Sequence, residues 1–318
     1  MREGELLQRI ISRSADLPSL FPNVLVGPGD DCAVVTAPGS STPLLLKVDQ
    51  VVEGRHFTPE TPYDFVARKA IARAVSDIAA MAGRPLFTLV GAALPANFEQ
   101  VRADALYEHL LKWSLHFGCP LVGGDTAVFD AAGGGGALTL SVTIVGTPHA
   151  TRGAVLRSGA QVGDDVYLTG ALGGSFLRHG PPFAGAGRHL TFEPRVREAS
   201  LLVEAIGQDL HALMDISDGL GLDAARLALR SGAAIEVDAA SIPLSRGVSD
   251  PLRAAADGED YELLFTVRSG VSVPSVLGST PVTRIGRVIP WQSSRPRCEL
   301  LHHGGRTAAD ALGWEHAG

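Results

Sequence analysis

Two carboxylates lie inside segments that otherwise have the composition of a protein core. Asp49 interrupts the apolar run LLLKVDQVV, and Asp77 interrupts the apolar run AVSDIAAM. An unpaired carboxylate is costly in an apolar interior, so it is retained only where cations or hydrogen-bond donors lie beside it. The fold must therefore bring positive charge to both positions.

Further acidic residues stand beside small residues where strands and helices are expected to end. They are Asp30 and Asp31 after Gly29, Asp125 in GGDT, Asp215 and Asp218 in DISDG, and Glu259 after Gly258. Any one of these acids alone is better explained as a turn former or a helix cap, and Asp77 alone as a buried partner of Arg73 or Arg84. Together, carboxylates that converge at strand ends repel one another unless cations lie between them.

The chemistry of these side chains favours Mg²⁺. The candidate ligands are hard carboxylate oxygens, with no Cys and few His among them, which suits Mg²⁺ better than zinc. Such an ion usually completes its shell with phosphate oxygens and water. The pattern predicts a nucleotide-dependent phosphoryl-transfer enzyme. A P-loop is absent because none of Lys47, Lys69 and Lys112 follows a glycine, and the protein-kinase loop motifs and HExxH are absent too.

Composition argues against several other classes of protein. The 27 basic and 34 acidic residues give a net charge of −7, which disfavours nucleic-acid binding. The three cysteines match no zinc or disulfide pattern, which favours a reducing, cytoplasmic location. The N-terminal residues lack the apolar region of a signal peptide, and the charge-free run 131–150 contains four consecutive glycines and a strand-like pattern. No membrane segment is expected.

Hydrophobic periodicity predicts an α/β chain with domains over 1–147 and 148–318. In the first, helices are expected over 3–14, from Thr61 (N-cap) and Pro62 to Gly83, and over 99–117, with strands over 32–36, 44–52, 86–94, 121–122 and 138–146. This order indicates a mixed sheet. The Gly- and Pro-containing stretch 147–163 marks the boundary. The second domain is expected to contain strands over 165–169, 234–238, 261–267 and 282–288, helices over 173–178, 194–206, 220–230 and near Pro251, and an irregular tail.

One motif supports a different class of function. The segment from Gly219 to Ala224 reads GxGxxA, and Asp238 lies about where a ribose-binding acid would stand in a dinucleotide-binding oxidoreductase. Asp218 argues against this, because it would place negative charge where the pyrophosphate approaches the helix. The adjoining ISDG resembles part of a nucleophile elbow, but Asp215 replaces its first glycine.

The acidic motifs, taken in order, resemble those of the thiamine-monophosphate kinase family, whose superfamily includes aminoimidazole ribonucleotide synthetase and selenophosphate synthetase. The resemblance runs nearly end to end. The matching motifs are GPGDDCAVV, VDQVVEGRHF, RKAIARAVSDIAAMAGRP, LVGGDT, LRSGAQVGD, MDISDGL, DGEDYELLFTV and GWEH. VEGRHF, GEDYELLF and GWEH favour the kinase over other ATP-using synthetases of the superfamily.

The resemblance implies a two-domain synthetase-like fold, with an N-terminal mixed sheet that pairs across a homodimer and a C-terminal α/β domain. It implies transfer of the γ-phosphoryl group of ATP to thiamine monophosphate in a cleft that holds ATP and several Mg²⁺ ions. By this resemblance the metal ligands are Asp31, Asp49, Asp77, Asp125, Asp215 and Asp218. The ATP-binding residues are Gly124, Asp125, Arg157 and Ser217, and the substrate-binding residues are His56, Glu259 and Trp314.

The implied reaction agrees with the residue chemistry. The nucleophile is a phosphate oxygen that is already anionic, so no general base is needed and the protein has to screen charge and align two phosphates. Trp314 could stack on the thiamine ring system, with attraction between its ring and the positive thiazolium. It is nearly as well explained as a tail residue that docks on the body, and His56 as a structural histidine.

The chain departs from the family pattern beside two of the acids. The family usually has two hydroxyl residues before Asp49 and Thr after it, where this chain has Lys47, Val48 and Gln50; Ala74 replaces a usual Asn. Val48 cannot supply a ligand, and Lys47 could place an ammonium where a metal would lie. The number of metal ions stays open, as does a non-catalytic homologue that binds ATP without turnover.

Overall fold

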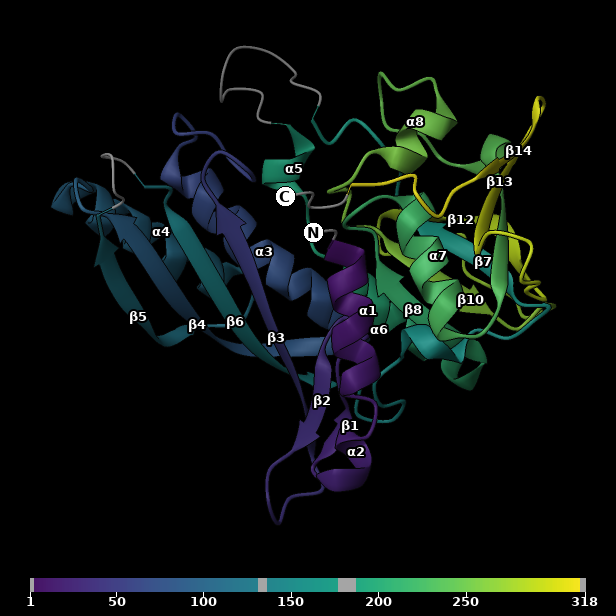
Figure 1. Ribbon diagram of the computed structural model, residues 1–318, viewed down its shortest axis with the longest axis horizontal. Coiled ribbons are helices and arrows are strands. Elements are labelled where there is room, and N and C mark those ends of the chain that lie inside the picture. The colour runs from purple at the N-terminus through teal and green to yellow at the C-terminus, as the bar shows by residue number, and fades with distance from the viewer. Residues whose placement is uncertain (1–2, 131–135, 177–186, 315–318) are drawn as a thin grey trace.

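Alternating apolar residues form a six-stranded sheet in the first half of the computed structural model, which describes residues 3–130, 136–176 and 187–314. The strands lie in the order β1-β2-β3-β6-β4-β5 (Figure 1). Only β4 and β5 pair in parallel, which confirms the mixed sheet. The strands are β1 (Val24–Val26), β2 (Ala33–Thr36), β3 (Pro43–Val52), β4 (Gly83–Pro95), β5 (Leu121–Phe129) and β6 (Thr139–Pro148).

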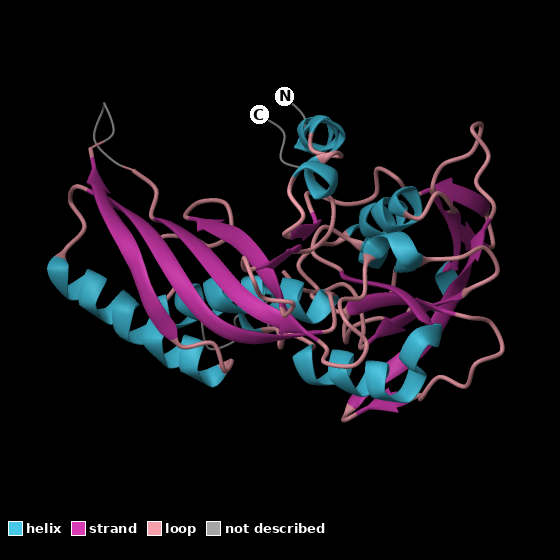
Figure 2. Ribbon diagram, turned by 90° about the horizontal axis from the view of Figure 1, so that it is seen from below, coloured by secondary structure: helices cyan, strands magenta, loops and turns pink. Residues whose placement is uncertain are grey.

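Helices α3 (Tyr63–Ala80) and α4 (Gln100–His116) cover one face of this sheet (Figure 2). Almost all of α3 is buried, because it also contacts helices and a strand of the second half. Thr61 was expected to cap α3, but its hydroxyl accepts a hydrogen bond from the Thr58 amide at 3.1 Å and Pro62 occupies the cap position. Gly83 begins β4 instead of closing the helix.

The second half contains a largely antiparallel sheet in the order β14-β13-β9-β12-β7-β10-β8, with β11 paired to β12. Only β13 and β9 pair in parallel. The strands are β7 (Asp165–Thr169), β8 (Leu210–Asp215), β9 (Ala234–Asp238), β10 (Leu263–Val267), β11 (Val276–Leu277), β12 (Thr280–Ile289), β13 (Cys298–His302) and β14 (Gly305–Ala308). The tail expected to be irregular therefore supplies two strands.

The other helices are α1 (Glu3–Arg13), α2 (Leu17–Leu20), α5 (Arg188–Thr191), α6 (Val196–Ile206), α7 (Leu220–Arg230) and α8 (Pro251–Ala256). Three short 3₁₀ turns are η1 (Arg157–Gly159), η2 (Gly207–Asp209) and η3 (Ala239–Ser241). A helix was expected over 173–178. Residues 173–176 are not helical, because Gly173 and Gly174 have φ of 77° and 76°, and the rest lies outside the described residues.

Each half has its own apolar core, and a third cluster joins α6 to β8 and β10 and to residues that follow α3. The helix α3 lies between the two halves (Figure 1). Among the described residues, no helix combines the length and apolar character needed to cross a bilayer.

Candidate active site

Three predicted metal ligands meet in a buried cluster. Asp31 comes from the loop between β1 and β2, Asp77 from α3 and Asp215 from the end of β8, and one oxygen of each lies within 4.8 Å of the others. Burial raises the pKa of Asp77 to about 7 against the pull of Lys47, with Asp49 and Asp31 adding to the rise. Burial and the charges of Asp77 and Asp31 raise the pKa of Asp215 well above its usual value. Burial and mutual repulsion therefore both disfavour the charged forms of Asp77 and Asp215.

Two cations and one hydroxyl contact this cluster directly. Arg157 donates to both carboxylate oxygens of Asp31, with Nε 2.9 Å from Oδ2. Lys47 Nζ lies 2.7 Å from Asp77 Oδ1, and Ser76 donates to Asp215 at 2.6 Å. The alternation of β3 directs Lys47 toward α3. The structure therefore places the Lys47 ammonium at the carboxylate cluster, as the sequence allowed.

The other predicted metal ligands lie outside the three-carboxylate cluster. Asp49 forms an ion pair with Arg73, Nε to Oδ2 at 2.8 Å. Although burial raises the pKa of Asp49, the charges of Arg73 and Lys47 bring it below its usual value. Asp218 pairs with Arg226 after the end of β8. Asp49 therefore already has the cation that its apolar surroundings require.

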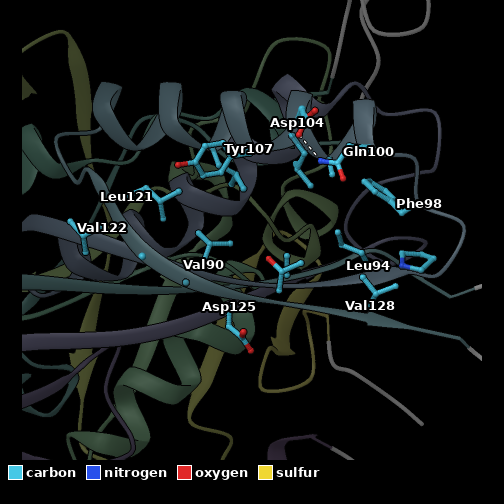
Figure 3. Close-up of a pocket in the computed structure, with 18 residues that line it drawn as sticks. Val90, Leu94, Phe98, Gln100, Asp104, Tyr107, Leu121, Val122, Asp125 and Val128 are labelled. Carbon is cyan, nitrogen blue, oxygen red and sulfur yellow. Dashed lines mark hydrogen bonds between the residues drawn. The ribbon is translucent and has the colours of Figure 1, made fainter.

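Gly124 and Asp125 lie on β5 at the edge of the sheet. In the sheet register, Gly124 on β5 pairs with Val90 on β4, Val90 pairs with Val142 on β6, and Val142 pairs with Asp49 on β3. Three strand spacings therefore separate Gly124 from Asp49, a distance of about 14 Å. Both residues line a cavity of about 650 Å³ beside α4, together with Tyr107. Figure 3 shows Asp125 pointing to the side of the strands opposite α4. Within one chain, Asp125 is remote from the carboxylate cluster.

A cleft of about 410 Å³ opens beside the cluster and brings together two predicted ATP-binding residues, Arg157 and Ser217. Asp77, Lys47 and Asp218 also line it, as do residues of α1 and α7. The glycine loop closes one side: Gly29 has φ of 121°, and a Cβ there would lie 2.9 Å from the Arg230 guanidinium carbon. The positive φ strongly favours glycine at this position, whereas the contact with the flexible end of Arg230 could be relieved by a small shift of that side chain.

A second cavity of about 220 Å³ contains all three predicted substrate-binding residues, His56, Glu259 and Trp314. It shares Ser217 and Asp218 with the larger cleft, so the two spaces adjoin. The Glu259 amide donates to the Ser217 carbonyl at 2.7 Å, and Glu259 has φ of 63°. This uncommon backbone conformation holds the Glu259 main chain beside Ser217, while its carboxylate pairs with Lys69.

His56 and Trp314 have distinct local settings. Burial and the charges of Arg73 and Lys69 lower the pKa of His56 to about 4, so the ring is neutral at pH 7. Its Nδ1 accepts a hydrogen bond from the Val52 amide at 3.0 Å, which leaves the proton on Nε2. Trp314 is 41% exposed, and the Arg55 guanidinium lies 3.9 Å from the centre of its ring. The Glu315 and His316 positions of the GWEH motif lie outside the described residues.

Lys69 connects the substrate-side residues and was not singled out in the sequence. Its fully buried ammonium donates to the His56 carbonyl at 2.8 Å and to Glu259 at 2.7 Å, and lies 3.1 Å from His189 Nδ1. Burial lowers the pKa of Lys69 to about 8, with Glu259 opposing the change. Burial would raise the pKa of Glu259, but His189, Lys69 and Arg73 bring it to about 2. Only the folded chain reveals this hub, because its partners are distant in sequence.

Lys69→Met should lower the free energy of unfolding by about 3 kcal/mol, because it leaves the buried Glu259 carboxylate without its main counter-charge. Adding Glu259→Gln should recover part of the loss. Urea unfolding measures both changes, and Lys112→Met, which removes an exposed pair with Asp64, serves as the control with a change below about 1 kcal/mol. A Lys69→Met protein as stable as this control would contradict a role in holding Glu259.

The dinucleotide hypothesis does not fit the fold. The strand before α7, β8, pairs antiparallel with β10, whereas a dinucleotide fold needs parallel strands around the glycine motif. The amides of Ser217, Asp218 and Gly219 all donate to Asp223 Oδ2, at 2.9 to 3.1 Å. The start of α7 therefore already holds a carboxylate where a pyrophosphate would bind.

Comparison with known proteins agrees with this architecture. Residues 29–147 match the family described as AIR synthase related protein, N-terminal domain, and residues 161–298 match its C-terminal domain. Thiamine-monophosphate kinase of Rhodopirellula baltica is 37% identical over 287 residues, which is 85% of each chain. The enzyme of Escherichia coli K12 is 32% identical over 290 residues, covering 84% of this chain and 85% of the relative.

Solved structures give the same result. The structure described as AaThiL complexed with AMPPCP and TMP superposes with a TM-score of 0.78 at 30% identity, covering 100% of this chain and 99% of the other. Thiamine monophosphate kinase from Aquifex aeolicus superposes with a TM-score of 0.70 at 31% identity, covering 91% and 96%. Because relatives above 30% identity extend over more than four fifths of its length, the chain belongs to the thiamine-monophosphate kinase family of AIR synthase-related proteins.

Proposed function

We propose that this chain transfers the γ-phosphoryl group of ATP to the phosphate of thiamine monophosphate and forms thiamine diphosphate and ADP. The observation that carries the proposal is the pair of adjoining cavities. The larger contains Arg157 and the carboxylate Asp77, the smaller contains His56, Glu259 and Trp314, and both include Ser217 and Asp218. ATP in the larger space and thiamine monophosphate in the smaller would direct their phosphates toward these shared residues.

The described residues suit Mg²⁺. The cluster of Asp31, Asp77 and Asp215 offers hard oxygen ligands, and burial together with the neighbouring carboxylates raises the pKa of Asp77 and of Asp215, so a divalent cation would stabilise their charged forms. We assign these three as ligands and include Asp49, Asp125 and Asp218 as further candidates. Bound there, Mg²⁺ would screen the charge of the two phosphates and favour their alignment.

The chain's own residues bind and orient the reactants. An acceptor phosphate oxygen attacks the γ-phosphorus, the bond from that phosphorus to the bridging oxygen breaks, and ADP leaves with the bond's electron pair. Arg157 can neutralise phosphate charge, and His56 lies in the smaller cavity as a neutral imidazole at pH 7. The anionic Glu259 and the ring of Trp314 suit the cationic thiazolium. None of these groups has to remove a proton.

The proposed enzyme is a homodimer whose N-terminal sheets pack together. Large apolar side chains are exposed on the sheet strands, among them Val48, Phe87 and Leu89, and Figure 2 shows the helices on one face only. Asp125 also points away from α4 and lies far from the cluster of its own chain. A second copy packed on the open face would bring Asp125 to the carboxylate cluster of the partner chain.

We also propose that the boundary between the two domains lies between residues 147 and 148.

The decisive test is the choice of acceptor. Purified protein with ATP and Mg²⁺ should convert thiamine monophosphate to thiamine diphosphate and leave free thiamine unchanged, because the mechanism supplies no base to activate an alcohol. Product formation is followed by chromatography, with EDTA as the metal-free control and aminoimidazole-type synthetase substrates as the specificity control. Efficient phosphorylation of free thiamine, or turnover of only the synthetase substrates, would overturn the proposal.

A further inference from the structure

Lys47 is placed as a cation within the carboxylate cluster. Its Nζ lies 2.7 Å from Asp77 Oδ1, and its side chain is 27% exposed. On β3 it shares the inward face with Asp49, while the neighbouring Val48 is 59% exposed. A lysine in direct contact with a carboxylate is an ammonium at neutral pH, so this side chain brings one positive charge to the cluster.

We infer that the Lys47 ammonium takes the place of one divalent cation at the cluster of Asp31, Asp77 and Asp215, so that the site needs one Mg²⁺ fewer than it would with a neutral residue there. The inference rests on the proposed function, which makes this cluster a Mg²⁺ and phosphate site. The position of the ammonium comes from its 2.7 Å contact with Asp77. Lys47 is thus a positioning and charge-screening residue of the phosphate site.

Charge balance supports this role. Three carboxylates meet one guanidinium, Arg157, and one ammonium, Lys47, at direct contact distance. Without Lys47 the three carboxylates would carry one more uncompensated negative charge, and this would favour binding of a divalent ion. With Lys47 present, a metal ion on the same oxygen of Asp77 would meet a like charge within a few ångströms, which disfavours its binding. One cation therefore excludes the other at this oxygen.

The test counts metal ions directly. Mn²⁺ is titrated into the full-length protein with AMPPCP present, and free Mn²⁺ is followed by electron paramagnetic resonance. Lys47→Ser should bind one more Mn²⁺ per chain than the wild type, because the hydroxyl supplies no charge. Lys47→Arg keeps the charge and should bind the wild-type number. Lys112→Ser, at an exposed lysine on α4, is the matched control and should also match the wild type.

Thermal unfolding gives an independent readout. In EDTA, Lys47→Ser should melt below the wild type, and Mg²⁺ should restore its melting temperature, because the divalent ion replaces the lost ammonium. If Lys47→Ser folds only with Mn²⁺ and then holds one additional ion per chain, the inference stands. Equal Mn²⁺ counts in Lys47→Ser and wild type, an extra ion in Lys47→Arg, or a Lys47→Ser protein that Mn²⁺ cannot fold would each overturn it.

The outcome is distinguishable from failure of the proposed function. The ion count and the melting temperatures need no turnover, so they report on Lys47 even if thiamine monophosphate is not the acceptor. Where the kinase reaction is observed, the initial rate of Lys47→Ser against Mg²⁺ at fixed ATP should rise more steeply than that of the wild type. Superimposable curves would count against the inference while leaving the kinase assignment intact.

Discussion

Asp215→Asn is expected to lower the rate of thiamine diphosphate formation by at least about a hundredfold, because loss of a residue that only supports a metal ligand already costs about 10 to 100-fold in affinity or activity. The substitution keeps the shape of the side chain, and the amide oxygen can still accept the hydrogen bond from Ser76. Steady-state kinetics at saturating Mg²⁺ measure the loss. Near-normal kcat under these conditions would remove Asp215 from the metal site.

The same substitution should raise the melting temperature in EDTA at pH 7.5. The raised pKa of Asp215 means that the folded protein holds its proton more tightly than the unfolded chain does, so stability is full below the unfolded pKa and falls as pH rises through the folded value. The neutral asparagine side chain removes that penalty. Asp238→Asn, at an exposed position that caps a 3₁₀ turn, should leave both activity and stability nearly unchanged.

Asp125→Asn and Asp77→Asn should each be inactive alone, yet the two chains combined should recover about a quarter of wild-type activity. If Asp125 serves the partner's cluster, a mixed dimer keeps one intact site, formed by the chain that retains Asp77 and the Asp125 of the other chain. About half of the dimers in an equal mixture are mixed, and each has one working site of two. The quarter is expected for an unfractionated equal mixture of the two chains; co-expression with two affinity tags followed by double purification isolates the mixed dimer, whose activity should reach about half of the wild-type value.

The control for this experiment is a pair within one cluster. Asp77→Asn combined with Asp215→Asn should stay inactive, because both residues belong to the same chain's cluster and no arrangement of subunits restores it. Failure of the Asp125 and Asp77 pair to recover activity, with mixed dimers demonstrated by the two tags, would place Asp125 in its own chain's site or outside catalysis.

Much of the fold and part of the site could be predicted from local sequence. Alternating and helical apolar periods locate β3, α3, α4, α6 and α7 to within a few residues, because burial of one face is decided within each element. Carboxylates inside apolar segments or beside small residues at the ends of elements made Asp31, Asp77 and Asp215 candidates, and the structure brings these three together.

Tertiary structure alone decided where the charges pair. Asp49 and Asp77 look alike in sequence, yet Arg73 neutralises the first and Lys47 enters the cluster with the second. Lys69 reads as an ordinary helix lysine, but packing of both halves against α3 buries it beside Glu259. Local propensity sets each backbone segment, whereas the partner of a buried charge depends on which distant segment packs against it. For that reason the sequence by itself singled out the acidic residues as candidates, and the three-dimensional packing determined which of them meet and which cation each one contacts.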